Sequence, residues 1–552
     1  MTREFDYRED APRLALLAAV WAGLFLAVDP RGQFPLNDDF QYAECARRLL
    51  EGQGLRLPEW ALSSTVSHAA LGALMTAPWG ASNQALRIWM IVLGGAGAAL
   101  VYALARRWRA GADAALLAAL TAALCPLYAA MSASFHLDVM AAAFTLAALL
   151  AFLRGREQGS AGWLAAASAL VAVSGLARQT GFLCVIGGAG ALALERRLTP
   201  RAAAALFLPS GLAAAVFWYW LRFVNGPTWA WRSGLFSPPT ELHYWLRVDV
   251  WGTVLGRISK SIQTGALCLA PLALLRARDA AKRPMKRAEW AAFALIVGAA
   301  LIGWVFAGGL PLIQNTLTRS GLGAVTLLGA QGKPAGWWGS PWLWSGAAAT
   351  ALLSSLILTR GAADLFDGPL GGEIRAAALF AGAPYAAMLL MPALYDRYLL
   401  TVLPAAAAAF AAGRADSGKR LIPARILLAA MAFFTWAGLA DYFAWNRARW
   451  EAGMGVVARG VPAENIENGF DWDGEFSLTR NLALLESRKS AREIGMWDWE
   501  HLNRIVLETA FTAAPPAAGW TLVGRFPYRT PLVPGGGEVR MYAAPGRATL
   551  YR

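Results

Sequence analysis

The chain has 552 residues, of which 57% are hydrophobic and 16% are charged, and 50 Lys and Arg against 36 Asp and Glu give a formal net charge of +14. Soluble proteins carry about a quarter charged residues, so this composition argues against an ordinary cytosolic enzyme. The basic side chains stand in short groups between long apolar runs, which favours a membrane protein over a nucleic-acid-binding protein.

Apolar runs long enough to cross a bilayer recur along most of the chain. A bilayer core about 30 Å thick requires roughly 20 apolar residues per helix, and about thirteen runs approach that length. They predict a polytopic α-helical membrane protein whose first run is a retained span, because no small-residue cleavage site follows it. The approximate spans are 13–28, 84–104, 112–130, 135–153, 160–176, 179–195, 201–223, 251–275, 288–309, 341–359, 374–391, 397–413 and 423–444.

Alternate loops between these spans carry the groups of Lys and Arg. Cytoplasmic loops are enriched in these residues, so the pattern places the N-terminus in the cytoplasm and the C-terminal part outside. The basic loops are the N-terminus, 106–109, 154–156, 196–201, 276–287, 360–375 and 414–425.

Two domains are predicted from a change of composition near residue 445. Residues 1–445 form the transmembrane domain, and residues 446–552 are mixed polar sequence with turn formers. Short alternating stretches near 520–526 and 538–544 predict strands, so the second domain is expected to be a small extracytoplasmic α/β domain.

Three outer segments, 29–83, 224–250 and 310–340, are too long to be simple turns, and long loops tend to carry function. Residues 40–51 repeat apolar side chains at helical spacing and predict an amphipathic helix along the outer surface. Many aromatic residues of 218–251 and 337–344 are interpreted as interfacial belts, with carbohydrate stacking as the alternative. Those of the first group are Trp218, Tyr219, Trp220, Trp229, Trp231, Tyr244, Trp245 and Trp251.

Acidic residues at the outer face of a membrane bundle are candidates for function because they are costly there. Asp38 and Asp39 begin the predicted outer helix, and Asp138 lies at the outer end of the fourth span. Helix capping is the alternative for each of them. His136 has no partner at metal-ligand spacing, so a hydrogen-bonded structural role is favoured over metal binding.

Two outer arginines, Arg178 and Arg397, run against the charge pattern and therefore need partners at that membrane level. The planar donors of an arginine suit a lipid or sugar phosphate. The alternatives are headgroup snorkelling for Arg178 and a salt bridge with Asp396 for Arg397. The four cysteines (Cys45, Cys125, Cys184 and Cys268) show neither disulfide-framework nor zinc-site spacing, and no nucleotide-binding motif occurs.

Together these motifs resemble the bacterial GT-C glycosyltransferases, in particular the branch with protein mannosyltransferases and lipid A aminoarabinose transferases. The resemblance rests on the order and shared sidedness of Asn37-Asp38-Asp39, Asp138, Arg178-Gln179, and the segment from Tyr395 to Leu400 followed by Pro404. It covers about residues 10–445.

The resemblance implies transfer of a sugar from a polyprenyl-phosphate donor to an acceptor hydroxyl on the outer face, usually with inversion. It implies that Asp38 or Asp39 is the catalytic base, that Asp138 orients the acceptor or the base, and that Arg178 and Arg397 bind the lipid phosphate. Tyr395, Tyr398 and His136 are predicted to contribute to substrate binding. Glu44, Glu51 and Glu59 are possible matches for a further family acid in the first loop.

The chemistry of transfer agrees with these residue types. A carboxylate can take the acceptor's proton, and a departing phosphate needs cations more than a general acid. We predict no cofactor beyond the lipid-linked sugar; a divalent metal is possible but nothing requires it.

Two other classes of function remain: a transporter or flippase of lipid-linked saccharides, and a noncatalytic structural membrane subunit. A transporter is expected to place polar residues near mid-span and to use broken helices in related halves. The sugar, the acceptor and the oligomeric state are not determined by the sequence.

Overall fold

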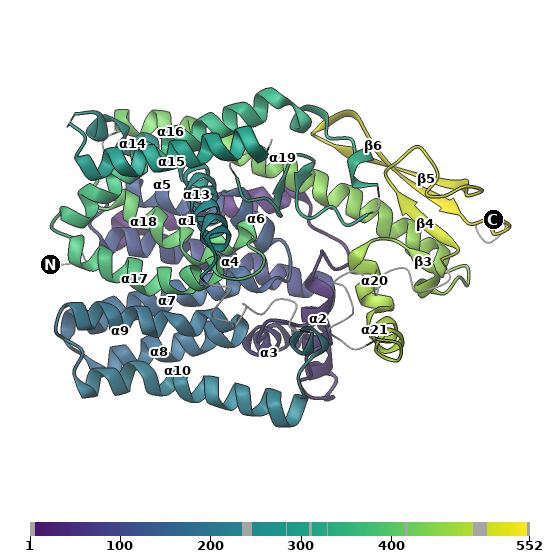
Figure 1. Ribbon diagram of the computed structural model, residues 1–552, viewed down its shortest axis with the longest axis horizontal. Helices are drawn as coiled ribbons and strands as arrows, with labels where there is room; N and C mark the ends of the chain where they lie inside the picture. Colours follow the sequence, from purple (N-terminus) through teal and green to yellow (C-terminus); the bar gives the residue numbers. More distant parts are fainter. Residues whose placement is uncertain are drawn as a thin grey trace.

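The computed structural model describes residues 6–233, 246–282, 284–307, 312–327, 329–414, 418–489 and 505–548. It consists of a helical bundle with a small sheet at one end of its long axis (Figure 1). Each predicted span coincides with helical structure. The helices of the bundle are α1 (Tyr7–Val28), α4 (Asn83–Arg107), α5 (Ala112–Ala123), α6 (Pro126–Ser132), α7 (Leu137–Gln158), α8 (Ala161–Ala177), α9 (Cys184–Leu194), α10 (Pro200–Trp220), α13 (Val248–Cys268), α14 (Ala270–Ala281), α15 (Arg287–Ala307), α16 (Pro341–Asp367), α17 (Gly371–Leu389), α18 (Leu403–Ala411) and α19 (Gly418–Val457).

Fewer helices than predicted are long and apolar enough to cross a membrane on their own. Among the described residues six satisfy both criteria, and the number rises to eight if each of two bent pairs is one span. The polytopic helical architecture is therefore confirmed, whereas the predicted count of thirteen spans is not.

The two bent pairs have a local cause. α5 and α6 meet at an angle of 64°, and α13 and α14 meet at 91°. Pro126 and Pro271 stand in the first turn of α6 and α14. Proline lacks an N–H and clashes with the preceding turn, so it is tolerated at a helix start but ends the helix before it.

Two glycines let α4 and α6 approach each other closely. A Cβ added at Gly97 would lie 2.3 Å from the Tyr128 Oη, and one at Gly94 would lie 2.5 Å from the Ser132 Oγ. In this close contact the Tyr128 hydroxyl donates to the Gly94 carbonyl at 2.7 Å.

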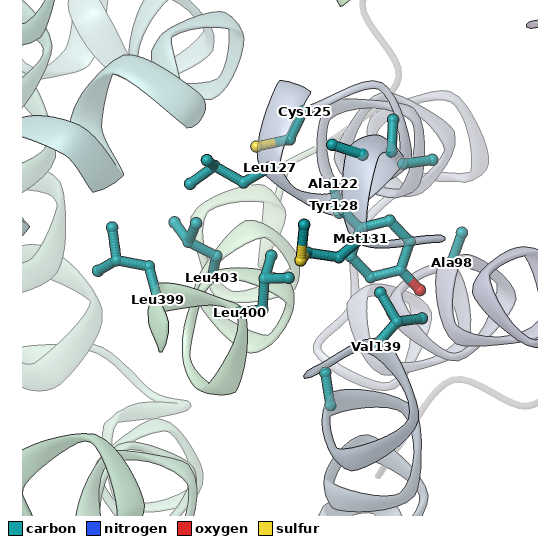
Figure 2. Packing of buried hydrophobic residues seen from close by; sticks show 14 of the residues in the cluster. Ala98, Ala122, Cys125, Leu127, Tyr128, Met131, Val139, Leu399, Leu400 and Leu403 are labelled. Atoms are coloured by element: carbon teal, nitrogen blue, oxygen red, sulfur yellow. The ribbon is translucent and has the colours of Figure 1, made fainter. Parts of the chain in front are cut away.

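The buried core continues from α6 to the segment that carries Arg397. Figure 2 shows Leu127 and Met131 of α6 beside Leu400 and Leu403, which belong to η5 (Asp396–Thr401) and α18. This apolar packing fixes η5 against α6 and thereby sets the position of the arginine.

The end of the bundle next to the sheet carries further elements. α2 (Asp39–Leu50) and α3 (Val66–Thr76) lie at the same end as the sheet (Figure 1). α2 confirms the helix predicted for residues 40–51. A short hairpin of β1 (Leu317–Thr318) and β2 (Gly321–Leu322) lies in the predicted outer segment 310–340.

The C-terminal part forms a four-stranded sheet with two helices, α20 (Phe470–Phe476) and α21 (Leu478–Glu486). Its strand order is β3-β4-β6-β5. The pairing is antiparallel except between β3 and β4. The strands are β3 (Ile466–Glu467), β4 (Leu507–Ala510), β5 (Thr521–Thr530) and β6 (Val533–Ala543). The last two confirm the strands predicted near 520–526 and 538–544.

One long helix connects the bundle to this sheet. α19 has 40 residues, runs without interruption across residue 445, and packs against β5 and β6 (Figure 1). A buried ion pair fixes the outer segment to the same helix, because the Lys333 Nζ lies 2.5 Å from the Asp441 Oδ2 and donates to the Ser320 carbonyl. The bundle, the outer loops and the sheet are thus connected through α19.

Candidate active site

Four helix ends bring the predicted site residues together at the end of the bundle that carries the sheet. Asp38 is the N-cap residue of α2, and His136 is the N-cap residue of α7. Arg178 ends α8, and Arg397 lies in η5. Each of the predicted residues except Asp39 contacts at least one other member of the group through its side chain. The full group comprises Asp38, Asp39, His136, Asp138, Arg178, Tyr395, Arg397 and Tyr398.

Asp138 is buried at the centre of this group. One of its carboxylate oxygens, Oδ1, lies 2.5 Å from the Arg178 Nη1. The other, Oδ2, lies 2.6 Å from the His136 Nδ1 and 3.7 Å from the Arg397 Nε. Because its oxygens already face three cationic or hydrogen-bonding groups, Asp138 is suited to fixing their positions rather than to taking a proton.

Asp38 lies at the edge of the group, with its side chain 16% exposed. Its Oδ2 accepts a hydrogen bond from the Arg397 Nη2 at 3.1 Å and lies 3.5 Å from the His136 Nε2. Burial raises the pKa of Asp38, but the hydrogen bond with His136 and the charge of Arg397 outweigh it, so the pKa is below its ordinary value. Asp38 is therefore a carboxylate at neutral pH.

Asp39 faces away from Asp38, although the two are adjacent. It is 2% exposed, and its Oδ2 accepts a hydrogen bond from the Phe135 backbone N–H at 2.9 Å. Burial raises the pKa of Asp39 to about 7. The residue before the pair, Asn37, has a φ of 54°, a left-handed conformation that asparagine tolerates. It leads into the turn from which the two carboxyl groups point in different directions.

These side chains do not make the contacts that the alternative roles of capping, local pairing and snorkelling would require. Asp38 occupies the N-cap position of α2, but its side chain makes no capping hydrogen bond. Asp396 accepts hydrogen bonds from the Thr316 and Leu317 backbone N–H groups, while Arg397 contacts Asp38. Arg178 contacts Asp138 within the protein.

Two tyrosines hold the arginines in place. The Arg178 guanidinium lies 4.4 Å from the ring centre of Tyr398, and that of Arg397 lies 4.8 Å from the ring centre of Tyr395. The two rings meet edge to face at 5.4 Å. Cation–π contacts of this kind orient a guanidinium without consuming its N–H donors. The predicted tyrosines therefore support the arginines.

A cavity of about 820 Å³ opens beside this group. Its wall combines charged residues of the group, an apolar strip at 388–393 and several aromatic rings. Asp38 lines the cavity, whereas Asp39 and Asp138 do not. The lining residues are Asn37, Asp38, Gln41, Tyr42, Trp60, Leu62, Ser63, Arg178, Gln179, Thr180, Ala230, Trp231, Asn315, Ala324, Val325, Thr326, Met388, Met391, Pro392, Ala393, Tyr395, Arg397, Tyr398 and Phe470.

Several cavity residues were not predicted from the sequence. Asn315 accepts a hydrogen bond from the Arg397 Nη1 at 3.0 Å, and Trp60 and Phe470 face the cavity from distant segments. No local motif surrounds them. Gln179 was part of the Arg178-Gln179 motif, and it receives a hydrogen bond from the Ser64 N–H.

The three acids considered in the first outer loop have different surroundings. Glu44 pairs with Arg47 and Arg48 on α2, and exposed Glu51 accepts from Gln53. Glu59 instead accepts a hydrogen bond from the Trp229 backbone N–H at 2.5 Å, at the start of α11 (Trp229–Arg232). Glu59 is therefore the acid that connects two segments of the cavity wall.

No group of three or more His, Cys, Asp or Glu side chains that could hold a metal ion occurs in the part of the chain that the structure describes. Of the aromatic residues singled out above, Tyr244 and Trp245 lie outside the described residues.

Comparison with known proteins gives one family match. Residues 64–221 match the family described as dolichyl-phosphate-mannose-protein mannosyltransferase. The matched segment contains His136, Asp138 and Arg178. No curated protein matches the chain.

Solved structures show distant similarity to the chain. ArnT from Cupriavidus metallidurans bound to undecaprenyl phosphate is 14% identical, with 98% of each chain covered and a TM-score of 0.41. The Archaeoglobus fulgidus oligosaccharyltransferase complex with Zn and sulfate is 15% identical, with 74% of this chain and 54% of that chain covered and a TM-score of 0.31. Mycobacterial arabinofuranosyltransferase AftD is 14% identical, with 99% and 41% covered and a TM-score of 0.36.

The match over residues 64–221 confirms the predicted resemblance to the protein mannosyltransferases and the prediction of a membrane glycosyltransferase.

Proposed function

We propose that the protein transfers a sugar from a polyprenyl-phosphate donor to an acceptor hydroxyl at the extracytoplasmic face of a bacterial inner membrane. One observation carries this proposal: the Asp38 carboxylate and the Arg178 and Arg397 guanidinium groups line the same cavity. A base and two cations beside one space are what this displacement requires.

Asp38 is the base in the proposed reaction. Its carboxylate takes the proton of the acceptor hydroxyl while that oxygen forms a bond to the anomeric carbon of the donor sugar. The bond between the anomeric carbon and the phosphate oxygen breaks, and the polyprenyl phosphate leaves with the electron pair. A single displacement inverts the anomeric centre, and Asp38 then releases its proton to water.

Arg178 and Arg397 stabilise the phosphate in this proposal. A guanidinium offers five N–H donors in a plane that matches phosphate oxygens. Arg178 presents one of its nitrogens to Asp138, and Tyr398 holds its plane. The apolar residues Met388 and Met391 line the same cavity and suit the first isoprene units of the lipid.

The division of roles between the acids is tested with Asp38→Asn and Asp39→Asn. Asp38→Asn removes the base, so we expect sugar transfer to fall by roughly a hundred- to ten-thousand-fold. Asp39→Asn is the matched control and should keep most activity, because Asn imitates the neutral form of Asp39. Transfer of a labelled sugar from a polyprenyl-phosphate donor to outer-envelope acceptors measures both variants.

Membrane insertion and expression of each variant must equal those of the wild type. Full activity of inserted Asp38→Asn would rule out Asp38 as the base. The same assay separates the other functions, because a flippase would move the labelled lipid across the bilayer without transferring sugar.

The proposed topology places residue 1 in the cytoplasm and the domain of residues 446–552 outside. The alternating basic loops support it. Reporter fusions at the N-terminus and after residue 552 test the two sides.

A further inference from the structure

An aromatic wall, defined here as Trp60, Trp231 and Phe470, lines the cavity that contains Asp38. The three rings come from the first outer loop, from α11 and from α20 of the C-terminal part. Segments that are far apart in the sequence therefore present flat apolar surfaces to the same space.

Contacts behind the wall hold it in place. Trp60 stacks on Trp229 with ring centres 5.4 Å apart and planes 9° from parallel, and Phe470 meets Trp60 at 6.3 Å. The Ala230 N–H donates to the Glu59 carbonyl at 3.0 Å. Because these contacts do not depend on a ligand, the aromatic surface is preformed.

Neutral polar side chains line the same cavity as these rings. Gln41 lines the cavity and is 4% exposed, and its Oε1 has no hydrogen-bond partner among the described residues. The Thr180 Oγ1 and the Trp231 Nε1 are also buried atoms without a hydrogen-bond partner among the described residues. Buried polar atoms are almost always hydrogen-bonded in native proteins, so these atoms need partners, which the hydroxyl groups of a ligand in the cavity would supply.

The two features together select one ligand chemistry. Flat aromatic rings pack against the C–H face of a sugar, and neutral amide, hydroxyl and indole groups match sugar hydroxyls. A phosphate would require cations, which in this cavity lie at Arg178 and Arg397 instead. A bare lipid chain would leave the Gln41 amide unpaired.

We propose that Gln41, Thr180 and the aromatic wall form a subsite for an uncharged, hydroxyl-bearing sugar ring. This inference rests on the proposed function for its place in the reaction. The ring belongs either to the lipid-linked donor or to a glycan acceptor, since both expose the same surface. Trp231 thus belongs to the subsite, in line with the carbohydrate-stacking alternative, rather than to an interfacial belt.

Binding without turnover tests the subsite. The full-length protein in nanodiscs is titrated by calorimetry with polyprenyl phosphate and with polyprenyl-phosphate hexose. For the wild type we expect tighter binding of the sugar-bearing lipid. Trp231→Ala should weaken that binding by up to about tenfold, which is the size of an aromatic contact, and should leave polyprenyl phosphate alone unaffected. Gln41→Leu should act in the same direction.

Trp342→Ala is the matched control, because Trp342 is 87% exposed and lies in the first turn of α16. It should bind both lipids as the wild type does. Trp231→Phe keeps a ring and should recover part of the affinity for the sugar-bearing lipid.

A second measurement identifies the source of the sugar. If Trp231→Ala binds both lipids normally but raises the KM for a neutral glycan acceptor about tenfold, the subsite holds the acceptor sugar. Equal weakening for both lipids would overturn the proposal, since the variant would then have disturbed the cavity as a whole. Unchanged lipid binding together with an unchanged acceptor KM would also overturn it.

Failure of the subsite and failure of the proposed function give different results. A protein that binds polyprenyl-phosphate hexose through Trp231 but transfers no sugar keeps the subsite and loses the transferase assignment. If the wild type transfers sugar but Trp231→Ala and Gln41→Leu have no effect, the transferase assignment is kept and the subsite is lost.

Discussion

Asp38 and Asp39 are neighbours in the chain, but their carboxyl groups meet different surroundings. Asp38 faces Arg397 and the cavity, and Asp39 faces the Phe135 backbone N–H. The hydrogen bond with His136 and the charge of Arg397 favour the charged form of Asp38, and burial favours the neutral form of Asp39. The same residue type thus titrates in two different pH ranges.

The raised pKa of Asp39 predicts a dependence of stability on pH. Its folded pKa of about 7 is above the ordinary value of 3.8, so the folded state prefers the protonated form. This contribution to stability is complete below the ordinary value and is lost as the pH rises through about 7. Asp39→Asn removes the titration, so the wild type should lose stability relative to Asp39→Asn between about pH 4 and pH 7.

Thermal unfolding of both proteins in the same detergent, followed across that pH range, measures the difference. A difference that stays constant from pH 4 to pH 8 would show that Asp39 does not titrate between the folded and unfolded states.

At the scale of elements, the site depends on how closely helices approach. α4 and α6 meet at Gly94 and Gly97, and the Tyr128 hydroxyl occupies the space that a Cβ of Gly97 would fill. The same α6 packs against η5, which carries Arg397 (Figure 2). A change in this contact therefore acts on the site through packing.

Gly97→Ala tests the close approach. The added Cβ would lie 2.3 Å from the Tyr128 Oη, so the ring must move, and we expect a loss of about 1–3 kcal/mol in the free energy of unfolding. Gly190→Ala on α9 is the control, because nothing lies within 4 Å of its added Cβ. It should be neutral or stabilise by about 0.5–1 kcal/mol.

Denaturation monitored by near-ultraviolet circular dichroism in detergent compares the two variants. Equal stability of Gly97→Ala and Gly190→Ala would contradict the packing described for α4 and α6.

At the scale of the whole molecule, α19 joins the bundle, the outer loops and the sheet. The Lys333–Asp441 pair fixes the segment before α16 to this helix. Phe470, which comes after α19 in the chain, lines the cavity. The C-terminal part therefore contributes to the candidate site.

The buried pair predicts non-additive effects of substitution. Lys333→Met leaves the Asp441 carboxylate buried without its cation, so we expect a loss of about 3–5 kcal/mol in the free energy of unfolding. The double variant Lys333→Met, Asp441→Leu removes both charges and should recover much of that loss. A double-mutant cycle of unfolding measures the coupling, and purely additive losses would contradict a direct pair.

The sequence alone determined the helical membrane architecture and the strands of the C-terminal part, and it supplied eight candidate site residues as a prediction. Apolar run length and alternation are local properties, so they can be read without knowing the fold. The resemblance placed Asp38, Asp138, Arg178 and Arg397 in one site, and the structure brings them into contact.

Only the tertiary structure decided the features of the site that depend on contacts between distant segments. It separated Asp38 from Asp39 because a carboxyl group's protonation depends on neighbours from other segments. It also assigned Glu59 to the attachment of α11 and placed Trp60, Trp231 and Phe470 around one cavity. These residues are far apart in the chain, and only long-range packing makes them neighbours.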